Sequence, residues 1–257
     1  MSNVLETTIV TAVRNRNETI KQTLPSWLAV GVSEIIVVDF RDDGCESVWD
    51  VVKPFENARI KVVETKYEYM FIHGLSNNLA IDQVTNKYVL KLESDYILQG
   101  NFFGKNKIQP HSFIGGVWSE DWHKWGLLYV EKRHLEFCNG YNENIIYPTC
   151  SDTDLDERLR IHLRKIQLHE ETVYHLSHSD DIRFDGYLKQ AKEETGAILH
   201  HASIRFNNVL IKAIPWTAES KRNQWTLSQI EPNRYLALRA FGQKHLNNSE
   251  VNDERNK

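Results

Sequence analysis

The chain has 257 residues, of which 41% are hydrophobic and 11% aromatic, so it can bury the core of one large α/β domain or of one domain with a small appendage. Its formal net charge of -4 gives no overall basic field, which argues against nucleic-acid binding. No apolar run approaches the ~18 residues of a membrane-spanning helix, and the N-terminal MSNVLETTIV lacks the basic and apolar blocks of a signal peptide. We therefore expect a cytoplasmic protein without a transmembrane segment. Peripheral contact with the inner face of a membrane, or contact with a second copy, stays open.

Strand-like and helix-like segments alternate through the first part of the chain. The continuous apolar or β-branched runs TTIVTAV and EIIVVDF are typical of parallel strands covered on both faces. We expect strands over 7–13, 34–40 and 59–64, and a further one that opens at Tyr88. We expect helices over 17–30, 46–56 and 74–84. This order predicts an α/β fold with a Rossmann-like, open and mostly parallel sheet flanked by helices.

The second half is less regular. Strand patterns over 113–117 and 126–131 enclose the aromatic loop WSEDWHKW, and the chain becomes mainly helical in pattern from Phe184 onward. We expect one α/β domain over 1–183, a helical extension over 184–246 and a disordered tail over 247–257. The cysteines Cys45, Cys138 and Cys150 form no CxxC pair, so we expect three free, buried or half-buried thiols in a reducing compartment.

Polar residues follow the predicted strands where each one ends. They are Arg14, Asn15 and Arg16 after the first strand, Asp39 at the end of the second, and Glu93, Ser94 and Asp95 after the fourth. Ligands of open α/β sheets bind outside the carboxyl ends of the strands, so these side chains should meet at one crevice. No loop carries GxGxxG or GxxxxGK[ST], which argues against a dinucleotide site or a P-loop of the usual kind.

The tripeptide Glu93-Ser94-Asp95 allows two interpretations. It is either a strand end in water or a pair of carboxylates that bind a hard divalent cation, which would in turn neutralise a diphosphate. The histidines of YHLSHSDD, His175 and His178, are either surface residues or, together with a carboxylate and a phosphate oxygen, ligands of Mn²⁺.

The segment CSDTDLDERLR places Asp152, Asp154 and Asp156 at the start of a predicted helix. Carboxylates there suit the helix dipole, with Ser151 or Asp152 as N-cap. One that opens into the crevice is also well placed to act as a general base. In the aromatic loop, Trp118, Trp122 and Trp125 are either a small hydrophobic core or a platform for the apolar face of a sugar; stacking on nucleic-acid bases fits the acidic balance poorly.

Five segments, in chain order, resemble the motifs of one enzyme family. They are TAVRNRNETIKQTL, VVDF, GLSNNLAIDQVTNKYVLKLESDYIL, FCNGYNENIIYPTCSDTDLDERL and HLSHSDD, and the likeness covers roughly residues 7–181. Together they resemble GT-A glycosyltransferases of the inverting family 2 type, and the related β-1,4-galactosyltransferase and chondroitin-polymerase domains. ESD stands where that family has DxD, Asn77 replaces a usual arginine, and YPTCS replaces Trp-Gly-Gly-Glu.

The resemblance implies a residue for each role. Asp152 matches the catalytic base of inverting members, and Asp95 matches the DxD aspartate that contacts the metal. Glu93 and His178, with His175 as the alternative to His178, would complete a site for Mn²⁺ or Mg²⁺. The implied donor-binding residues are Arg14, Asn15, Asp39, Asn78, Glu93 and Ser94. The implied acceptor or sugar contacts are Trp118, Trp122, Trp125 and Asp154.

These features predict an inverting, metal-assisted glycosyltransferase that moves a hexose or N-acetylhexosamine from a UDP-sugar to a glycan or glycolipid hydroxyl. The altered acceptor motif leaves open a non-catalytic sugar- or nucleotide-binding module in a glycan-assembly complex. A sugar-nucleotide pyrophosphorylase fits less well, because no Gly-rich, Arg/Lys-bearing triphosphate loop follows the first strand.

Overall fold

The computed structural model describes residues 3–42, 44–55, 59–65, 73–116, 124–145 and 150–177, and the short pieces 208, 211–212, 215–220 and 222. The predicted helical extension over 184–246 lies outside the described residues except for those pieces, and the predicted tail over 247–257 lies wholly outside them. None of the helices in the described part of the chain is long and apolar enough to cross a membrane.

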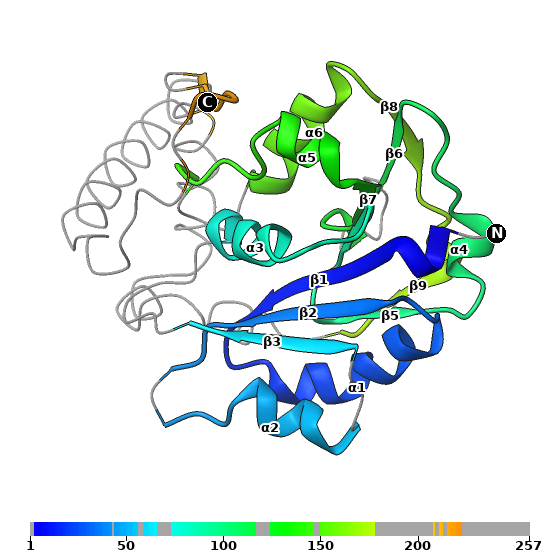
Figure 1. The fold of residues 1–257 in the computed structure, drawn as a ribbon, viewed down its shortest axis with the longest axis vertical. Helices are drawn as coiled ribbons and strands as arrows, with labels where there is room; N and C mark the ends of the chain where they lie inside the picture. The colour runs from blue at the N-terminus through cyan, green and yellow to red at the C-terminus, as the bar shows by residue number, and fades with distance from the viewer. Residues whose placement is uncertain are drawn as a thin grey trace, which may run out of the picture.

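The fold is built around one mixed sheet of seven strands in the order β3-β2-β1-β4-β7-β6-β8 (Figure 1). Its strands are β1 (Thr7–Val13), β2 (Glu34–Asp39), β3 (Ile60–Glu64), β4 (Tyr88–Lys91), β6 (Ser112–Gly115), β7 (Leu128–Glu131) and β8 (Arg164–Gln167). Within this sheet β7 alone runs antiparallel to its two neighbours, so the predicted mostly parallel sheet is confirmed. A second sheet pairs β5 (Tyr96–Leu98) with β9 (Val173–His175) in antiparallel register.

Helices cover both faces of the main sheet. They are α1 (Asn17–Ala29), α2 (Val48–Val52), α3 (His73–Asp82), α4 (Phe102–Lys105), α5 (Lys132–Phe137) and α6 (Ser151–Arg160). Short 3-10 turns are η1 (Asn3–Glu6), η2 (Lys53–Phe55) and η4 (Glu170–Thr172). In Figure 1, α3, α5 and α6 lie on one side of the sheet and α1 and α2 on the other.

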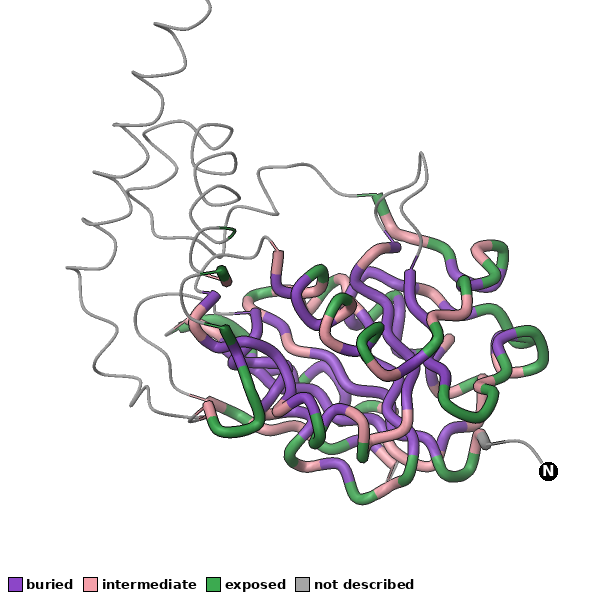
Figure 2. Tube along the Cα trace, turned by 90° about the horizontal axis from the view of Figure 1, so that it is seen from above, coloured by how far each residue is buried: buried purple, intermediate pink, exposed green. Residues whose placement is uncertain are grey.

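The continuous apolar runs of the central strands serve two hydrophobic cores. Along β2, Ile36 and Val38 face the core shared with α3, α5 and α6, whereas Ile35 and Val37 face the core shared with α1 and α2. Successive side chains of a strand point to opposite faces, so a strand buried on both sides must be apolar throughout. Figure 2 shows these strands as buried tube at the centre of the described part.

Three local predictions need correction. The helix predicted over 46–56 is only α2 followed by η2, because Pro54 supplies no backbone N–H with which to extend the helix. The N-cap of α6 is Cys150, with a left-handed φ of 70°, and not Ser151 or Asp152. All three cysteines are free, as predicted, but Cys45 is exposed and not buried or half-buried.

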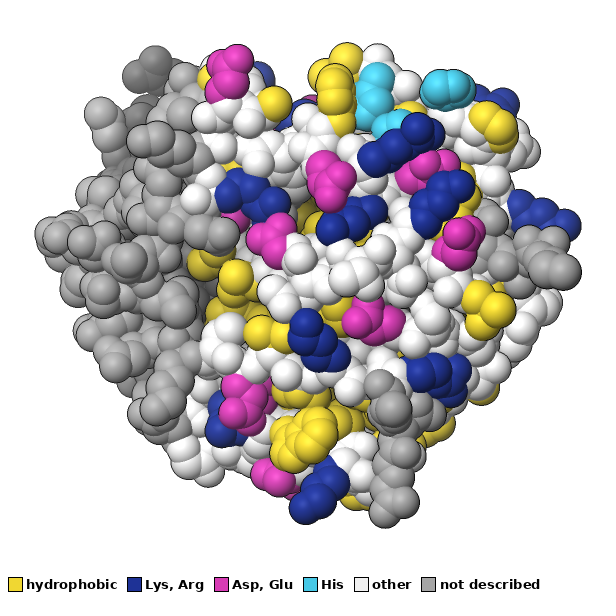
Figure 3. All heavy atoms as spheres, viewed as in Figure 1, with side chains coloured by type: hydrophobic (Ala, Val, Ile, Leu, Met, Phe, Trp, Pro, Cys, Tyr) yellow, Lys and Arg dark blue, Asp and Glu magenta, His cyan; other side chains and the backbone are white. Residues whose placement is uncertain are grey.

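Residues 215–220 and 222 lie against the body of the domain. Trp216 Nε1 donates a hydrogen bond to the carbonyl oxygen of Asn139 (2.9 Å), and Arg222 Nη2 lies 2.9 Å from the Asp82 carboxylate in α3. On the face drawn in Figure 3, basic and acidic side chains alternate over the described surface. The charged residues on this face therefore do not gather into a field of one sign.

Candidate active site

The centre of the candidate site is a lysine buried among carboxylates. Lys91 ends β4 and is 0% exposed. Its Nζ donates hydrogen bonds to Glu93 Oε1, to Asp152 Oδ1 (3.2 Å) and to the carbonyl oxygen of Gly126 (2.9 Å), and it lies 3.2 Å from His73 Nε2. An isolated buried ammonium is very costly, so these acceptors are what allow the lysine to remain charged here.

Three separate elements bring these groups together. His73 is the first residue of α3, Glu93 follows β4, and Asp152 lies in the first turn of α6. His73 Nε2 lies 3.1 Å from Glu93 Oε1, and His73 Nδ1 lies 2.8 Å from Ser151 Oγ. The site therefore joins the carboxyl end of a central strand to the N-termini of two helices on the same face of the sheet.

The cluster contains opposing electrostatic effects. Burial alone lowers the pKa of the Lys91 ammonium, but the charges of Asp152 and Glu93 outweigh it, so its pKa lies above the usual value. Burial raises the pKa of the Glu93 carboxyl, but Lys91 and His73 outweigh it, and its pKa falls well below the usual range. At neutral pH this lysine and this glutamate therefore form an ion pair.

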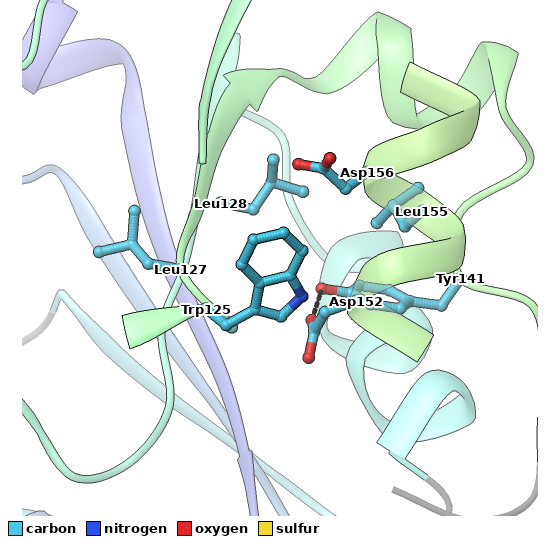
Figure 4. Close-up of a pocket in the computed structure, with 8 residues that line it drawn as sticks. Trp125, Leu127, Leu128, Tyr141, Asp152, Leu155 and Asp156 are labelled. Carbon is cyan, nitrogen blue, oxygen red and sulfur yellow. Dashed lines mark hydrogen bonds between the residues drawn. The ribbon is translucent and has the colours of Figure 1, made fainter. Parts of the chain in front are cut away.

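Asp152 faces an open pocket between β7 and α6 (Figure 4). The pocket has a volume of about 240 Å³ including open solvent, and its lining is Trp125, Gly126, Leu127, Leu128, Tyr141, Asp152, Leu155 and Asp156. Tyr141 Oη donates to Asp152 Oδ1 (3.0 Å), and burial, followed by the nearby carboxylates, raises the pKa of this tyrosine well above its usual value. Its hydroxyl therefore stays a donor that fixes one oxygen of Asp152.

Trp125 is the described member of the predicted tryptophan platform. Its indole lies opposite the Asp152 carboxylate in Figure 4, and Lys165 Nζ lies 4.4 Å from its ring centroid. The same ammonium pairs with Asp156 at 2.6 Å. Trp118 and Trp122 lie outside the described residues, so the platform as a whole stays a prediction.

The two ends of the aromatic loop are held together. Gly116 N donates to the carbonyl oxygen of Leu127 (3.0 Å), and a Cβ added at Gly116 would collide with the carbonyl of Lys124. Only glycine leaves room for this approach of the two backbones.

The loops that follow β1 and β2 are in contact. Arg14 Nη2 lies 2.5 Å from Asp42 Oδ1, and Asn15 Nδ2 donates to Asp42 Oδ2 (2.6 Å), so the loops after β1 and β2 are tied together. Asp39 is 1% exposed and accepts the backbone N–H groups of Arg41 (3.1 Å) and Val48 (2.9 Å). Burial raises the pKa of Asp39 despite these bonds. Nucleotide contact by these side chains stays a prediction.

The predicted metal ligands are not all in one place. Asp95 Oδ2 lies 3.6 Å from His175 Nε2, beside the β5–β9 pair, while Glu93 belongs to the Lys91 cluster. Ser94, whose carbonyl accepts from Thr23 Oγ1 (2.9 Å), links the two positions. His178 lies outside the described residues.

Asp154 and Asn78 have structural partners. Asp154 is paired with Arg158, its neighbour one turn along α6, at 2.6 Å. Asn78 is 0% exposed; its Nδ2 donates to Tyr141 O (3.0 Å) and Glu143 Oε1 (2.8 Å), and its Oδ1 accepts from Tyr141 N (2.8 Å). Asn78 therefore holds the loop that carries Tyr141, and direct contacts of Asn78 and Asp154 with substrate remain untested predictions.

Replacing Asn78 with alanine is expected to lower the free energy of unfolding by about 2–4 kcal/mol, because three hydrogen bonds are lost in a fully buried setting. Urea unfolding followed by circular dichroism measures this difference. The matched control is Asn101→Ala, since Asn101 is exposed and makes no side-chain cap hydrogen bond. Equal stabilities of the two variants would contradict the structural role.

Three residues of the site were not predicted from the sequence: Lys91, His73 and Tyr141. A charged residue inside the buried run YVLKL was the one available signal, since lysine is almost never fully buried without partners. His73 and Tyr141 gave no local signal, because their contacts with Glu93 and Asp152 join residues far apart in the chain.

No family model and no curated protein matches the chain. Several solved structures are similar to it in fold. A mannosyltransferase from Pyrobaculum calidifontis, in complex with GDP-Man and Mn²⁺, superposes with a TM-score of 0.58 at 14% identity over 80% of this chain and 64% of its own length. TarS residues 1–349 from S. aureus give 0.55 at 14% identity, over 81% of this chain and 74% of that one.

A Drosophila β1,4-galactosyltransferase 7 mutant in complex with manganese, UDP-Gal and xylobiose gives a TM-score of 0.52 at 16% identity, covering 71% of this chain and 75% of its own. The chain thus spans less than two thirds of the mannosyltransferase and about three quarters of the other two. At these identities the likeness concerns the fold. The described part of the chain has the GT-A fold of these glycosyltransferases.

Proposed function

We propose that this chain is an inverting glycosyltransferase that moves a hexose or N-acetylhexosamine from a UDP-sugar to a hydroxyl of a glycan or glycolipid, with Asp152 as general base. The proposal is supported most by the placement of Asp152 in the pocket. Its Oδ1 accepts hydrogen bonds from Lys91 and Tyr141, whereas its Oδ2 accepts none from the described residues. One oxygen is thus fixed and the other is available to take a proton.

In the proposed step, the acceptor oxygen bonds to the anomeric carbon from the face opposite the diphosphate, and the bond from that carbon to the diphosphate oxygen breaks. The acceptor proton passes to Asp152 Oδ2, and the nucleoside diphosphate leaves with the bonding electrons. Arg14 and Asp39, at the ends of neighbouring strands, are proposed to hold the nucleotide, together with Asn15 and Ser94. Asn78, which is fully buried, is proposed to act through the loop of Tyr141 and not by direct contact.

A divalent ion would neutralise the departing diphosphate when bound. Asp95 and the nearby His175 supply the carboxylate and imidazole chemistry that suits Mn²⁺, so Asp95, with His178 or His175, is the proposed ligand set. Glu93 fits less well, since its Oε1 is already engaged by both Lys91 and His73.

A panel of UDP-sugars and GDP-mannose, assayed for acceptor-dependent nucleotide release with and without Mn²⁺, tests the function. We expect release with one donor of the panel once a hydroxyl acceptor is supplied. The rival is a binding module without turnover, which is favoured by the segment YPTCS standing where the resembling family has Trp-Gly-Gly-Glu. Calorimetric binding of a nucleotide sugar with no nucleotide release over long incubation would establish the rival and reject the enzyme.

A further inference from the structure

Lys91 occupies an unusual place for a lysine. Its strand, β4, is central in the sheet and hydrogen-bonds to β1 on one side and β7 on the other. Because Val89, two residues earlier, packs in the core with α3 and α6, Lys91 points to that same face. The ammonium therefore lies inside the protein, behind Glu93 and Asp152, whose side chains remain 32% and 22% exposed.

The same position has the ligands of a metal site. His73, Glu93 and Asp152 each offer one ligand atom, and these three atoms lie within 4.8 Å of one another; within the described ranges they are the one such group. Lys91 Nζ lies within hydrogen-bonding distance of all three atoms. A divalent ion bound to them at ~2.0–2.2 Å would need the space that the ammonium fills.

We propose that Lys91 Nζ is the resident cation of the His73–Glu93–Asp152 cluster, so that Glu93 is a partner of this ammonium and not a ligand of a divalent ion. This inference refines the proposed function. It rests on that function only for the kind of reaction that Asp152 serves; the identity of the bound cation does not depend on it. Lys91 is then a positioning residue that acts through Asp152.

The count of protons supports this assignment. An ammonium has three N–H donors, and Glu93 Oε1, Asp152 Oδ1 and Gly126 O use all three. The arrangement is satisfied if His73 Nε2 carries a proton and donates it to Glu93 while Nδ1 accepts from the Ser151 hydroxyl. With that assignment every group has a partner, and the imidazole nitrogen that faces the cluster offers no lone pair to a metal.

The arrangement also defines the charge of the site. Two carboxylates and one ammonium leave a net charge of -1 beside the pocket. The ammonium ties the end of β4 to the first turn of α6, which fixes Asp152 Oδ1 and leaves Oδ2 without a hydrogen bond from the described residues. Any ion that the diphosphate needs must then be held by Asp95 and its histidine.

Manganese binding to the nucleotide-free full chain, measured by electron paramagnetic resonance of free Mn²⁺, tests the proposal. We expect Glu93→Gln to change any Mn²⁺ affinity of the otherwise unaltered chain by less than about twofold, because Glu93 is not a ligand. Lys91→Ala vacates the cation position and is expected to add a Mn²⁺ site, which Asp152→Asn in the same chain removes again. Lys87→Met is the control, because Lys87 is exposed beside β4.

A loss of Mn²⁺ affinity of about tenfold or more in Glu93→Gln would overturn the proposal, since a loss of that size means that Glu93 binds the ion or directly supports one of its ligands. A folded Lys91→Ala chain that gains no Mn²⁺ site would overturn it as well. If Lys91→Ala does not fold, the Mn²⁺ affinities of the unaltered chain and of Glu93→Gln still show whether Glu93 is a metal ligand. No nucleotide or sugar is present, so an absence of transferase activity has no bearing on this result.

Discussion

Replacing Asp152 with asparagine is expected to lower the rate of sugar transfer by about 10²- to 10⁴-fold, the usual contribution of a general base. The amide oxygen can still accept the hydrogen bonds from Lys91 and Tyr141, so the pocket keeps its shape. What is lost is the oxygen that takes the acceptor proton. Initial rates of nucleotide release at saturating donor and acceptor measure the effect.

The matched control for Asp152→Asn is Glu157→Gln, which removes a carboxylate from an exposed position of the same helix. Thermal melting of both variants separates chemistry from folding. If Asp152→Asn transferred sugar at the rate of Glu157→Gln, Asp152 would not be the base, and the proposed mechanism would be wrong even if the enzyme class were right.

The second large effect concerns stability. Replacing Lys91 with methionine, which has a similar length but no charge, is expected to lower the free energy of unfolding by about 3 kcal/mol. The variant leaves Glu93 and Asp152 close together without their shared cation. This loss of stability lies near the low end of the range for breaking a buried ion pair, because both carboxylates are partly exposed. Urea unfolding at pH 7 measures it, with Lys87→Met as the exposed control.

The stability difference between Lys91→Met and the unaltered chain is expected to depend on pH. In the unaltered chain the pKa of Glu93 is lowered, so its contribution is fully present above the pKa of an unfolded glutamate and is lost as the pH falls toward the folded value. In the variant the ammonium that lowers the pKa of Glu93 is gone, so this contribution is absent there. The difference should therefore be constant near pH 7 and shrink as the pH falls below about 4.3, the pKa of an unfolded glutamate; a difference that stays constant down to about pH 3 would assign the loss to packing.

The central strands of the fold could be predicted because they depend on the pattern of apolar residues within a short stretch of sequence. Strands buried on both faces have continuous apolar runs, as in β1 and β2, and their boundaries differ from the prediction by at most one residue. The antiparallel insertion of β7 between β4 and β6 could not be predicted from these runs, because strand order depends on contacts between distant segments.

The candidate site was predicted in part for the same reason. Asp152 and Glu93 follow from their places at a helix start and a strand end, and both lie in the cluster. Their common partner Lys91 lies within a sequence that is typical of a strand. The neighbouring residues give no sign that its side chain reaches Asp152 in α6. The separation of Asp95 from Glu93 has a related cause: Asp95 leads into β5, whose pairing with β9 takes it toward His175.

The contact between Gly116 and Lys124 has a consequence for how well the segment between them should tolerate substitution. The two backbones approach so closely that only glycine fits at 116, and the carbonyl of Gly126, which accepts from the Lys91 ammonium, follows two residues after Lys124. Residues 117–123 themselves lie outside the described residues. We expect substitutions among them to leave the Lys91 cluster in place as long as Gly116 is kept.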